Sequence, residues 1–273
     1  MRIRYKFVRI RTNMPAEVKI LVEGSTNVDS IAETGKELTQ PTITLVRDED
    51  LVMVVDPGIL ESQEVLVDAL AEEDLTVQDV NVVCITHSHI DHYRNVGMFP
   101  NAKVLEYFGL WEKSGVESWA EDYTANIQIR HTPGHDYTGI TLFVTTGPES
   151  GCPGVVAICG DVFWEENYPQ DPHDDAFASN PERLRESRHL VLKTADWIVP
   201  GHGPIYKNDR NKALNKDEIE VKAGKEEPRI VVTCKKCEKK MKQRDKCLCR
   251  PYLCFNCCEC GFDYPACGCS HKK

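Results

Sequence analysis

The sequence predicts an α/β fold in which short strands and helices alternate and polar motifs follow the strands. Two observations support this class. Apolar residues, many of them β-branched, gather in short runs, and two longer segments repeat apolar residues at helical spacing. Side chains that follow a strand are held by a rigid sheet and can face a cleft, so we expect reactive residues there.

The expected strands are short runs bounded by polar or turn residues. "LVMVVDPG" ends in a turn signal, and "VNVVCIT" is an almost continuous apolar run typical of a buried strand. The strand ranges are 17–24, 42–48, 51–58, 80–86, 102–107, 127–132, 139–146 and 154–161, and a shorter one lies in "DWIVPGHG" at 196–203.

Two segments are predicted to be helices. Residues 59–75 repeat apolar side chains at helical spacing after an acidic start. Residues 180–195 begin with Asn180, a residue favoured as an N-terminal cap, followed by Pro181 in the first turn.

Length and composition limit the class of protein. The chain has 273 residues and is 41% hydrophobic, enough for one large domain and an appendage. No apolar run is long enough to cross a bilayer. The opening "MRIRYKFVRIRT" alternates basic and apolar residues, which suits a strand and not a secretory signal. We therefore expect a protein of the cytoplasm, also present in the nucleus, with no membrane partner.

Charge and cysteine separate the end of the chain from its body. The net charge is −10, yet residues 234–273 carry ten Lys/Arg and four Asp/Glu, a net of +6, so residues 1–233 carry −16. Ten of the 13 cysteines lie in the same 40 residues. We predict three parts: a large domain at 1–207, a polar linker at 208–233 and a cysteine-rich tail at 234–273.

The stretch "THSHIDH" (86–92) is the strongest chemical signal. Three histidines and one aspartate follow a predicted strand directly. Histidine is the commonest protein ligand of zinc, and four donors in six residues exceed what one metal can use from one tight loop. The spacing therefore predicts a site for two metals.

Three further segments place a donor just after a strand. "HTPGHDYTG" offers His135, "ICGDVFW" offers Asp161, and "IVPGHGP" offers His202. The adjacent glycines permit tight backbone turns beside these side chains. Each segment alone is a weak signal, but together with "THSHIDH" they form a set.

This set resembles the motif signature of the metallo-β-lactamase superfamily. The similarity covers about residues 17–207, and "VVDPG" around Asp56 resembles the superfamily's first motif. The strings "DHYRNVGMFP", "TPGH", "GDVFW" and "VPGHGPIYK" are most similar to a small animal branch. The resemblance implies an αββα sandwich with metals at one edge of two sheets. It also implies an endoribonuclease for histone pre-mRNA 3′-end processing, and a homodimer.

The resemblance implies a role for each motif residue. Two metals would be held by His87, His89 and His135 on one side and by Asp91, His92 and His202 on the other, with Asp161 bridging them. Asp56 would orient the ligands without binding metal. His131 would pack in its strand, and His173 and His189 would lie on the surface.

Residues beside the motifs are candidate substrate contacts. The branch usually has Gly where this chain has Arg94, a cation that can point toward substrate. Tyr137 and Trp164 also flank the motifs, although packing is the commoner role for such aromatic side chains. No residue is identified as the general acid.

The implied chemistry is hydrolysis. Two divalent metals, most commonly zinc, about 3.5–4 Å apart share a hydroxide that attacks a polarised bond. Asp91 and Asp161 are the catalytic carboxylates. We expect an RNA phosphodiesterase. The alternatives are a glyoxalase II-like thioesterase or other small-molecule hydrolase, and a metal-handling or redox protein that acts through its tail.

The tail spacing predicts additional zinc. Cys234, Cys237, Cys254 and Cys257 form C-x2-C-x16-C-x2-C, in which each pair can bind one tetrahedral metal. Cys260 fits equally well in the second pair. With no secretory signal, metal binding is favoured over disulfides.

Overall fold

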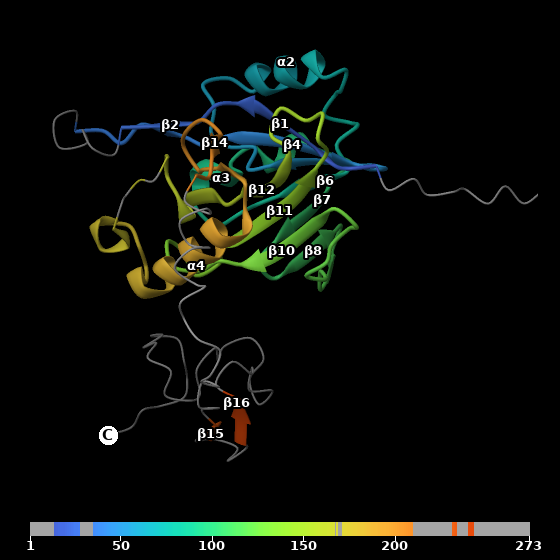
Figure 1. Ribbon diagram of the computed structural model, residues 1–273. Coiled ribbons are helices and arrows are strands. Elements are labelled where there is room, and N and C mark those ends of the chain that lie inside the picture. Colours follow the sequence, from blue (N-terminus) through green and yellow to red (C-terminus); the bar gives the residue numbers. More distant parts are fainter. Residues whose placement is uncertain are drawn as a thin grey trace, which may run out of the picture. The chain divides into compact units, whose positions relative to one another are not determined.

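The computed structural model describes residues 14–27, 35–166, 168, 171–209, 231–233 and 240–242 (Figure 1). The predictions for the N-terminal 13 residues, most of the linker and the tail cysteines fall outside these ranges. The chain divides into two units after residue 218, and the elements of the first unit are described below. In the second unit the described strands are β15 (Val231–Thr233) and β16 (Lys240–Lys242), which pair antiparallel.

Two mixed sheets form the centre of the first unit. The larger sheet has the order β1-β4-β5-β6-β7-β8-β9, and the smaller has the order β10-β11-β12-β13-β14. The larger sheet contains Glu17–Val22 (β1), Ile43–Asp48 (β4), Leu51–Val55 (β5), Val82–Cys84 (β6), Lys103–Glu106 (β7), Gly109–Glu112 (β8) and Gly115–Glu117 (β9). The smaller contains Ile127–His131 (β10), Ile140–Thr146 (β11), Gly154–Ile158 (β12), Trp197–Val199 (β13) and Tyr206–Lys207 (β14).

Helices connect parallel strands in both sheets. Helix α2 (Glu64–Glu72) links β5 to the parallel strand β6, and α4 (Pro181–Thr194) links β12 to the parallel strand β13. The two helices lie on opposite outer faces of the paired sheets (Figure 1). The layers are therefore helix, sheet, sheet, helix, and the predicted αββα sandwich is confirmed for the described part of the chain.

Alternating side chains along the strands build the three buried layers. In β5, Met53 and Val55 face the core between the sheets while Val54 packs under α2 with Leu66 and Leu70. In β12 the same alternation sends Val156 and Ile158 inward and Ala157 outward, under α4. Strands with two buried faces need apolar residues at every position, which is why their sequences are continuous apolar runs.

Both helices were located by the sequence, but one is shorter than predicted. Helix α4 matches the expected 180–195 closely, and the Asn180 side chain accepts a hydrogen bond from the Arg183 N–H as a cap. Helix α2 covers only the middle of the expected 59–75. Ser62 Oγ accepts from the Glu64 N–H where the helix begins, and Asp74, with φ of 57°, ends it.

The remaining elements are short and lie around the site described below. They are the paired strands β2 (Ser25–Thr26) and β3 (Thr39–Gln40), helix α3 (Ile90–Tyr93), and the 3₁₀ turns η2 (Val96–Met98), η3 (Gly160–Val162) and η4 (Pro172–Asp174). Among the described residues, no helix has the length and apolarity that a bilayer crossing requires.

Candidate metal centre

The carboxyl ends of two parallel strand pairs, β5 with β6 and β12 with β13, supply most of the candidate site. Asp56 follows β5 and His87 follows β6, while Asp161 follows β12 and His202 follows β13. Parallel strands present their carboxyl ends at the same sheet edge, so each pair delivers two polar segments to one place. The fold thus accounts for motifs that are far apart in sequence.

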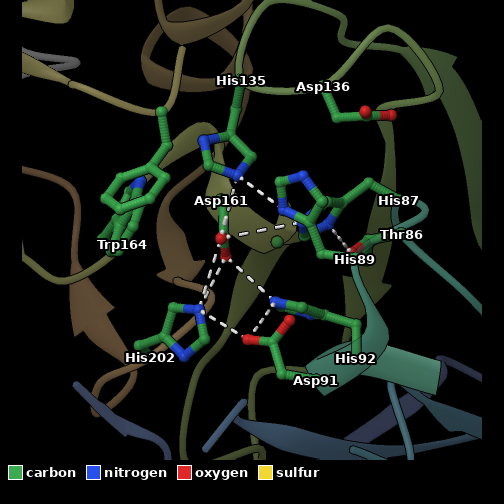
Figure 2. Close-up of polar contacts among 12 residues, drawn as sticks. Thr86, His87, His89, Asp91, His92, His135, Asp136, Asp161, Trp164 and His202 are labelled. Atoms are coloured by element: carbon green, nitrogen blue, oxygen red, sulfur yellow. Dashed lines mark hydrogen bonds and ion pairs between the residues drawn. The ribbon is translucent and has the colours of Figure 1, made fainter. Parts of the chain in front are cut away.

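Seven side chains converge at this edge in two groups (Figure 2). Within each group one donor atom of every member lies within 4.8 Å of the others. The first group is His87, His89, His135 and Asp161, and the second is Asp91, His92 and His202. The structure therefore brings together all seven residues that the sequence predicted as ligands of the two-metal site.

Donor atoms of the first group face a common point. His89 Nδ1 lies 3.0 Å from His87 Nε2 and 3.1 Å from His135 Nε2. His135 Nε2 is 3.2 Å from Asp161 Oδ2. Two ligand nitrogens on one tetrahedral zinc are about 3.3 Å apart when each bond is 2.0–2.1 Å. These separations fit ligands of a single ion.

The second group meets the other oxygen of Asp161. His92 Nε2 and His202 Nε2 each lie 3.3 Å from Asp161 Oδ1, and 3.7 and 3.6 Å from Asp91 Oδ2. Asp161 thus presents Oδ2 to the first group and Oδ1 to the second, and His202 Nε2 lies 3.3 Å from both oxygens. A carboxylate in this position can bridge two cations.

Two buried polar atoms without a hydrogen bond indicate whether the site fits metal ions. His92 Nε2 and Asp161 Oδ1 are buried and lie 3.3 Å apart, yet neither atom makes a hydrogen bond. Leaving such atoms unpaired costs free energy, and a coordinated cation would satisfy both. Five imidazoles and two carboxylates form a donor set that suits zinc and other first-row divalent metals. The residues present fit a dinuclear metal centre.

Asp56 and Thr86 orient the donors and are not members of either group. Asp56 accepts hydrogen bonds from the Thr86 N–H (2.8 Å) and hydroxyl (2.6 Å), and it lies 2.9 Å from His92 Nδ1. A carboxylate at Nδ1 favours the tautomer in which Nε2 is free to bind metal. The geometry is that expected of a residue that orients ligands.

His202 is oriented by the strand β3. Its Nδ1 lies 3.1 Å from the Gln40 carbonyl oxygen, which accepts only when Nδ1 carries hydrogen. Thr39 donates to Asp91 Oδ2 at 3.0 Å and lies 3.1 Å from His202 Nδ1. Gly201 is also required, because a Cβ there would overlap Asp161 Oδ1.

Burial and neighbouring carboxylates set the protonation of the histidines. Burial lowers the pKa of His87 well below its usual value, and the proximity of His92 lowers it further. Burial also opposes charge on His135, but the Asp161 and Asp175 carboxylates together outweigh it and raise the pKa of His135 to about 9. Metal binding needs neutral imidazole, so loading the site would release protons.

The other residues singled out from sequence are placed differently. Arg94 is exposed at the end of α3, and Tyr137 is 46% exposed beside the His135 loop. Trp164 is buried, and its ring lies between His135 and His202 at centroid distances of 5.4 and 5.6 Å. Burial leaves Trp164 as a packing residue, so its prediction as a substrate contact is not supported by its position.

The histidines predicted to lie outside the centre belong to neither group. His131, in β10, packs its ring 4.6 Å from that of Tyr107, and His189 is exposed on α4. The surface position predicted for the side chain of His173 lies outside the described side chains.

Sequence reasoning missed Thr39 and also Asp175, whose Oδ2 lies 3.4 Å from His135 Nδ1. Neither residue lies in a recognisable motif, and each reaches the site from a segment distant in sequence. Thr86, also unnoticed, carries a weak signal because it immediately precedes His87.

Comparisons with known proteins agree with this geometry. Residues 37–154 match the family model described as the metallo-beta-lactamase superfamily. The chain is 30% identical over 216 residues to metallo-beta-lactamase domain-containing protein 1 of Xenopus laevis, covering 75% of this chain and 87% of that protein. The chain belongs to the metallo-beta-lactamase superfamily. The human protein of the same name is 34% identical over 173 residues, covering 57% of this chain and 59% of its relative.

Solved structures of the superfamily share the fold. A protein described as a metallo-beta-lactamase, from Thermotoga maritima, aligns with a TM-score of 0.57 at 21% identity, covering 71% of this chain and 99% of that one. An N-acyl homoserine lactone hydrolase with product at its catalytic metal centre aligns with a TM-score of 0.51 at 17% identity, covering 70% and 94%. The chain is a hydrolase of the metallo-beta-lactamase superfamily with a cluster of residues able to bind metal.

Proposed function

We propose that this protein is a dinuclear metal-dependent hydrolase that cleaves phosphodiester bonds in RNA. The observation that carries the proposal is the Asp161 carboxylate, which turns one oxygen to each of two donor groups. A buried acid shared in this way is suited to holding two metals side by side. We propose zinc for both positions, since imidazole and carboxylate are its usual ligands.

The residues of the chain orient the metal ligands and bury most of them away from water. Two divalent metals held here would supply Lewis acidity and a nucleophile derived from water at neutral pH. Asp56 and Gln40 keep the outer nitrogens of His92 and His202 occupied, so that the inner ones remain available. His87, His92 and His202 are buried, whereas His89 and Asp91 are partly exposed and mark the side from which substrate can approach.

RNA as substrate is supported by motif similarity and by two exposed side chains. The strings around the ligands are most similar to the animal branch of RNA-cutting members. Arg94 is exposed directly after the helix that carries Asp91 and His92, where a cation can bind phosphate. Tyr137, two residues after His135, exposes an aromatic ring on which a base can stack.

A small ester or thioester is the second candidate substrate. Residues 1–233 carry a net charge of −16, which repels a polyanion and favours a compact substrate. The same donor groups serve either reaction, because the metals act on a carbonyl as they do on a phosphoryl group.

A hydrolysis panel distinguishes these candidates. The zinc-loaded protein would be given single-stranded RNA, S-lactoylglutathione, a lactone and a β-lactam, with Asp161→Ala as the inactive control. We expect RNA cleavage that exceeds turnover of the other three and is absent from the control. Turnover of only the thioester or the lactone would replace the RNA proposal, and no turnover of any substrate would contradict both candidates.

The cysteine tail is proposed to hold additional zinc. Its C-x2-C pairs, Cys234 with Cys237 and Cys254 with Cys257 or Cys260, match the spacing of tetrahedral zinc modules. Zinc content above two per chain that is lost on removing residues 234–273 would support this assignment.

A further inference from the structure

Asp175 is a buried carboxylate beside the first donor group. It belongs to neither group, and only 1% of its side chain is exposed. Its Oδ2 lies 3.4 Å from His135 Nδ1 and accepts a hydrogen bond from Trp164 Nε1 at 3.2 Å. Its Oδ1 accepts from the Phe177 N–H at 2.9 Å. All three contacts lock the carboxylate in one orientation.

The contact with His135 fixes which ring nitrogen faces the centre. Because a carboxylate only accepts, Nδ1 of His135 must carry the hydrogen of this bond. Nε2 is then the nitrogen with a free lone pair, and it is the atom that lies 3.1 Å from His89 Nδ1 and 3.2 Å from Asp161 Oδ2. Asp175 thus has the same relation to His135 that Asp56 has to His92.

Trp164 reinforces this orientation through the same oxygen. Its indole ring packs edge-on against His135, with an interplanar angle of 83°. The indole N–H is held by Asp175, so one carboxylate fixes both the ligand ring and the ring beside it. His135 consequently has little freedom to rotate away from the metal position.

We propose that Asp175 is a positioning residue that selectively maintains the metal held by His87, His89 and His135. This inference rests on the dinuclear part of the proposed function and is independent of the substrate. The second group contains no residue bonded to Asp175 in the described structure, so its metal should depend on Asp175 much less.

The test replaces Asp175 with Asn in the full chain. The Asn amide has only one oxygen, whereas the carboxylate accepts through both. If the amide oxygen faces His135 and Trp164, the NH₂ group faces the Phe177 N–H. If the amide is turned the other way, the NH₂ group faces the N–H groups of His135 and Trp164. Asp174→Asn removes the same charge from the exposed neighbouring position. Trp164→Phe removes the indole N–H and reduces the ring size but keeps an aromatic ring against His135.

The readout is the occupancy of each metal position, refined separately from anomalous diffraction of crystals equilibrated at graded free zinc. The first position is the one held by His87, His89 and His135. In Asp175→Asn the free zinc concentration that half-fills this position should rise about 10- to 100-fold, the loss of affinity typical when a ligand's orienting partner is removed. The second position should shift far less. Asp174→Asn should resemble the wild type at both positions, and Trp164→Phe should shift the first position less than Asp175→Asn does.

Other outcomes overturn the inference in distinguishable ways. An equal shift at both positions, or an equal shift in Trp164→Phe, would mean that Asp175 acts only by supporting the fold. Wild-type occupancy in Asp175→Asn would remove its role while leaving the dinuclear centre intact. Empty positions in the wild type would overturn the proposed function as well.

If Asp175→Asn does not fold, Asp175→Ser provides the same comparison. The serine hydroxyl oxygen can accept from the Phe177 N–H, but the serine side chain is too short to reach His135.

Discussion

Asp161 is the residue on which both donor groups depend. It is the only side chain of the seven that approaches members of both groups with different oxygens, Oδ2 toward His135 and Oδ1 toward His92 and His202. Burial opposes a charge on this carboxyl, but His202 and His92 beside it hold its pKa well below the usual range. The acid is therefore an anion in the folded protein, as a bridging ligand must be.

Replacing Asp161 with Ala should remove affinity for both metals and abolish hydrolysis. The loss should exceed the roughly 10- to 100-fold that follows from removing a residue that only orients a ligand. Bound metal and turnover on the active substrate are the measurements. His131→Ala is the control, because His131 is exposed and contacts Tyr107 and not the centre. Equal losses in the two variants would contradict the separation of ligand from strand histidines.

Arg94 provides a test of substrate class at the residue scale. If this exposed cation neutralises one phosphate, Arg94→Gln should weaken RNA binding and reduce the slope of log affinity against log salt by about 0.7. Turnover of an uncharged lactone should be unaffected. Lys113→Gln, in the exposed turn between β8 and β9, serves as the matched loss of charge. An identical salt slope in Arg94→Gln and wild type would exclude Arg94 as a phosphate contact.

The sequence predicts ligands better than it predicts the residues that orient them. His87, His89, Asp91 and His92 share one short segment, and His135, Asp161 and His202 each stand beside glycine at a strand end, so their pattern is visible. Thr39 and Asp175 reach the site only through tertiary folding. A single polar residue without local pattern cannot be distinguished from any other surface residue by sequence alone.

At the scale of elements, the loop that carries His135 depends on its contact with α4. Gly134 has φ of +141°, and a Cβ at this position would overlap the backbone of Leu184 in the first turns of that helix. The Asn180 N–H also donates to the Gly134 carbonyl at 2.8 Å. The loop and the helix start are therefore packed as one unit, which places His135.

Gly134→Ala should destabilise this unit strongly. Backbone strain and overlap with Leu184 should together cost roughly 2–4 kcal/mol in the free energy of unfolding, and zinc affinity should fall with it. Denaturant unfolding of the metal-free protein measures the first quantity. Gly97→Ala is the control, since nothing lies within 4 Å of a Cβ there, and its effect should stay within about 1 kcal/mol. A neutral Gly134→Ala would show that the loop can move without consequence.

Element types were more predictable than element ends. The apolar run at 80–86 correctly indicated a buried strand, β6, and the runs at β5 and β12 were correctly predicted to be strands. The start of α2 was predicted five residues early because Ile59 and Leu60 lie in helical phase with Leu66 and Val67. These two residues follow Gly58, whose N–H and carbonyl bond to the α3 segment instead. Hydrogen bonds to a distant segment are not visible in a local pattern.

At the scale of the whole molecule, charge is divided between the body and the tail. Residues 1–233 carry −16 and residues 234–273 carry +6, while every described donor of the metal centre precedes residue 208. A basic segment can bind an anionic partner that an acidic body repels. The tail is therefore proposed as a docking segment for RNA.

Removing residues 234–273 should weaken RNA binding and its dependence on salt, because fewer phosphates would be neutralised. Turnover of a small substrate should persist, since the donor groups are retained. If the tail serves instead as a metal-stabilised cap on the body, its removal would lower the melting temperature and leave the salt slope unchanged. Measuring both quantities on the shortened chain decides between the two roles.

The most direct test of the central claim is anomalous diffraction from a zinc-loaded crystal of this protein. The account predicts two peaks about 3.5–4 Å apart, one among His87, His89 and His135 and the other among Asp91, His92 and His202, with the Asp161 carboxylate between them. A single peak, or zinc bound elsewhere while these seven side chains hold none, would contradict the dinuclear assignment.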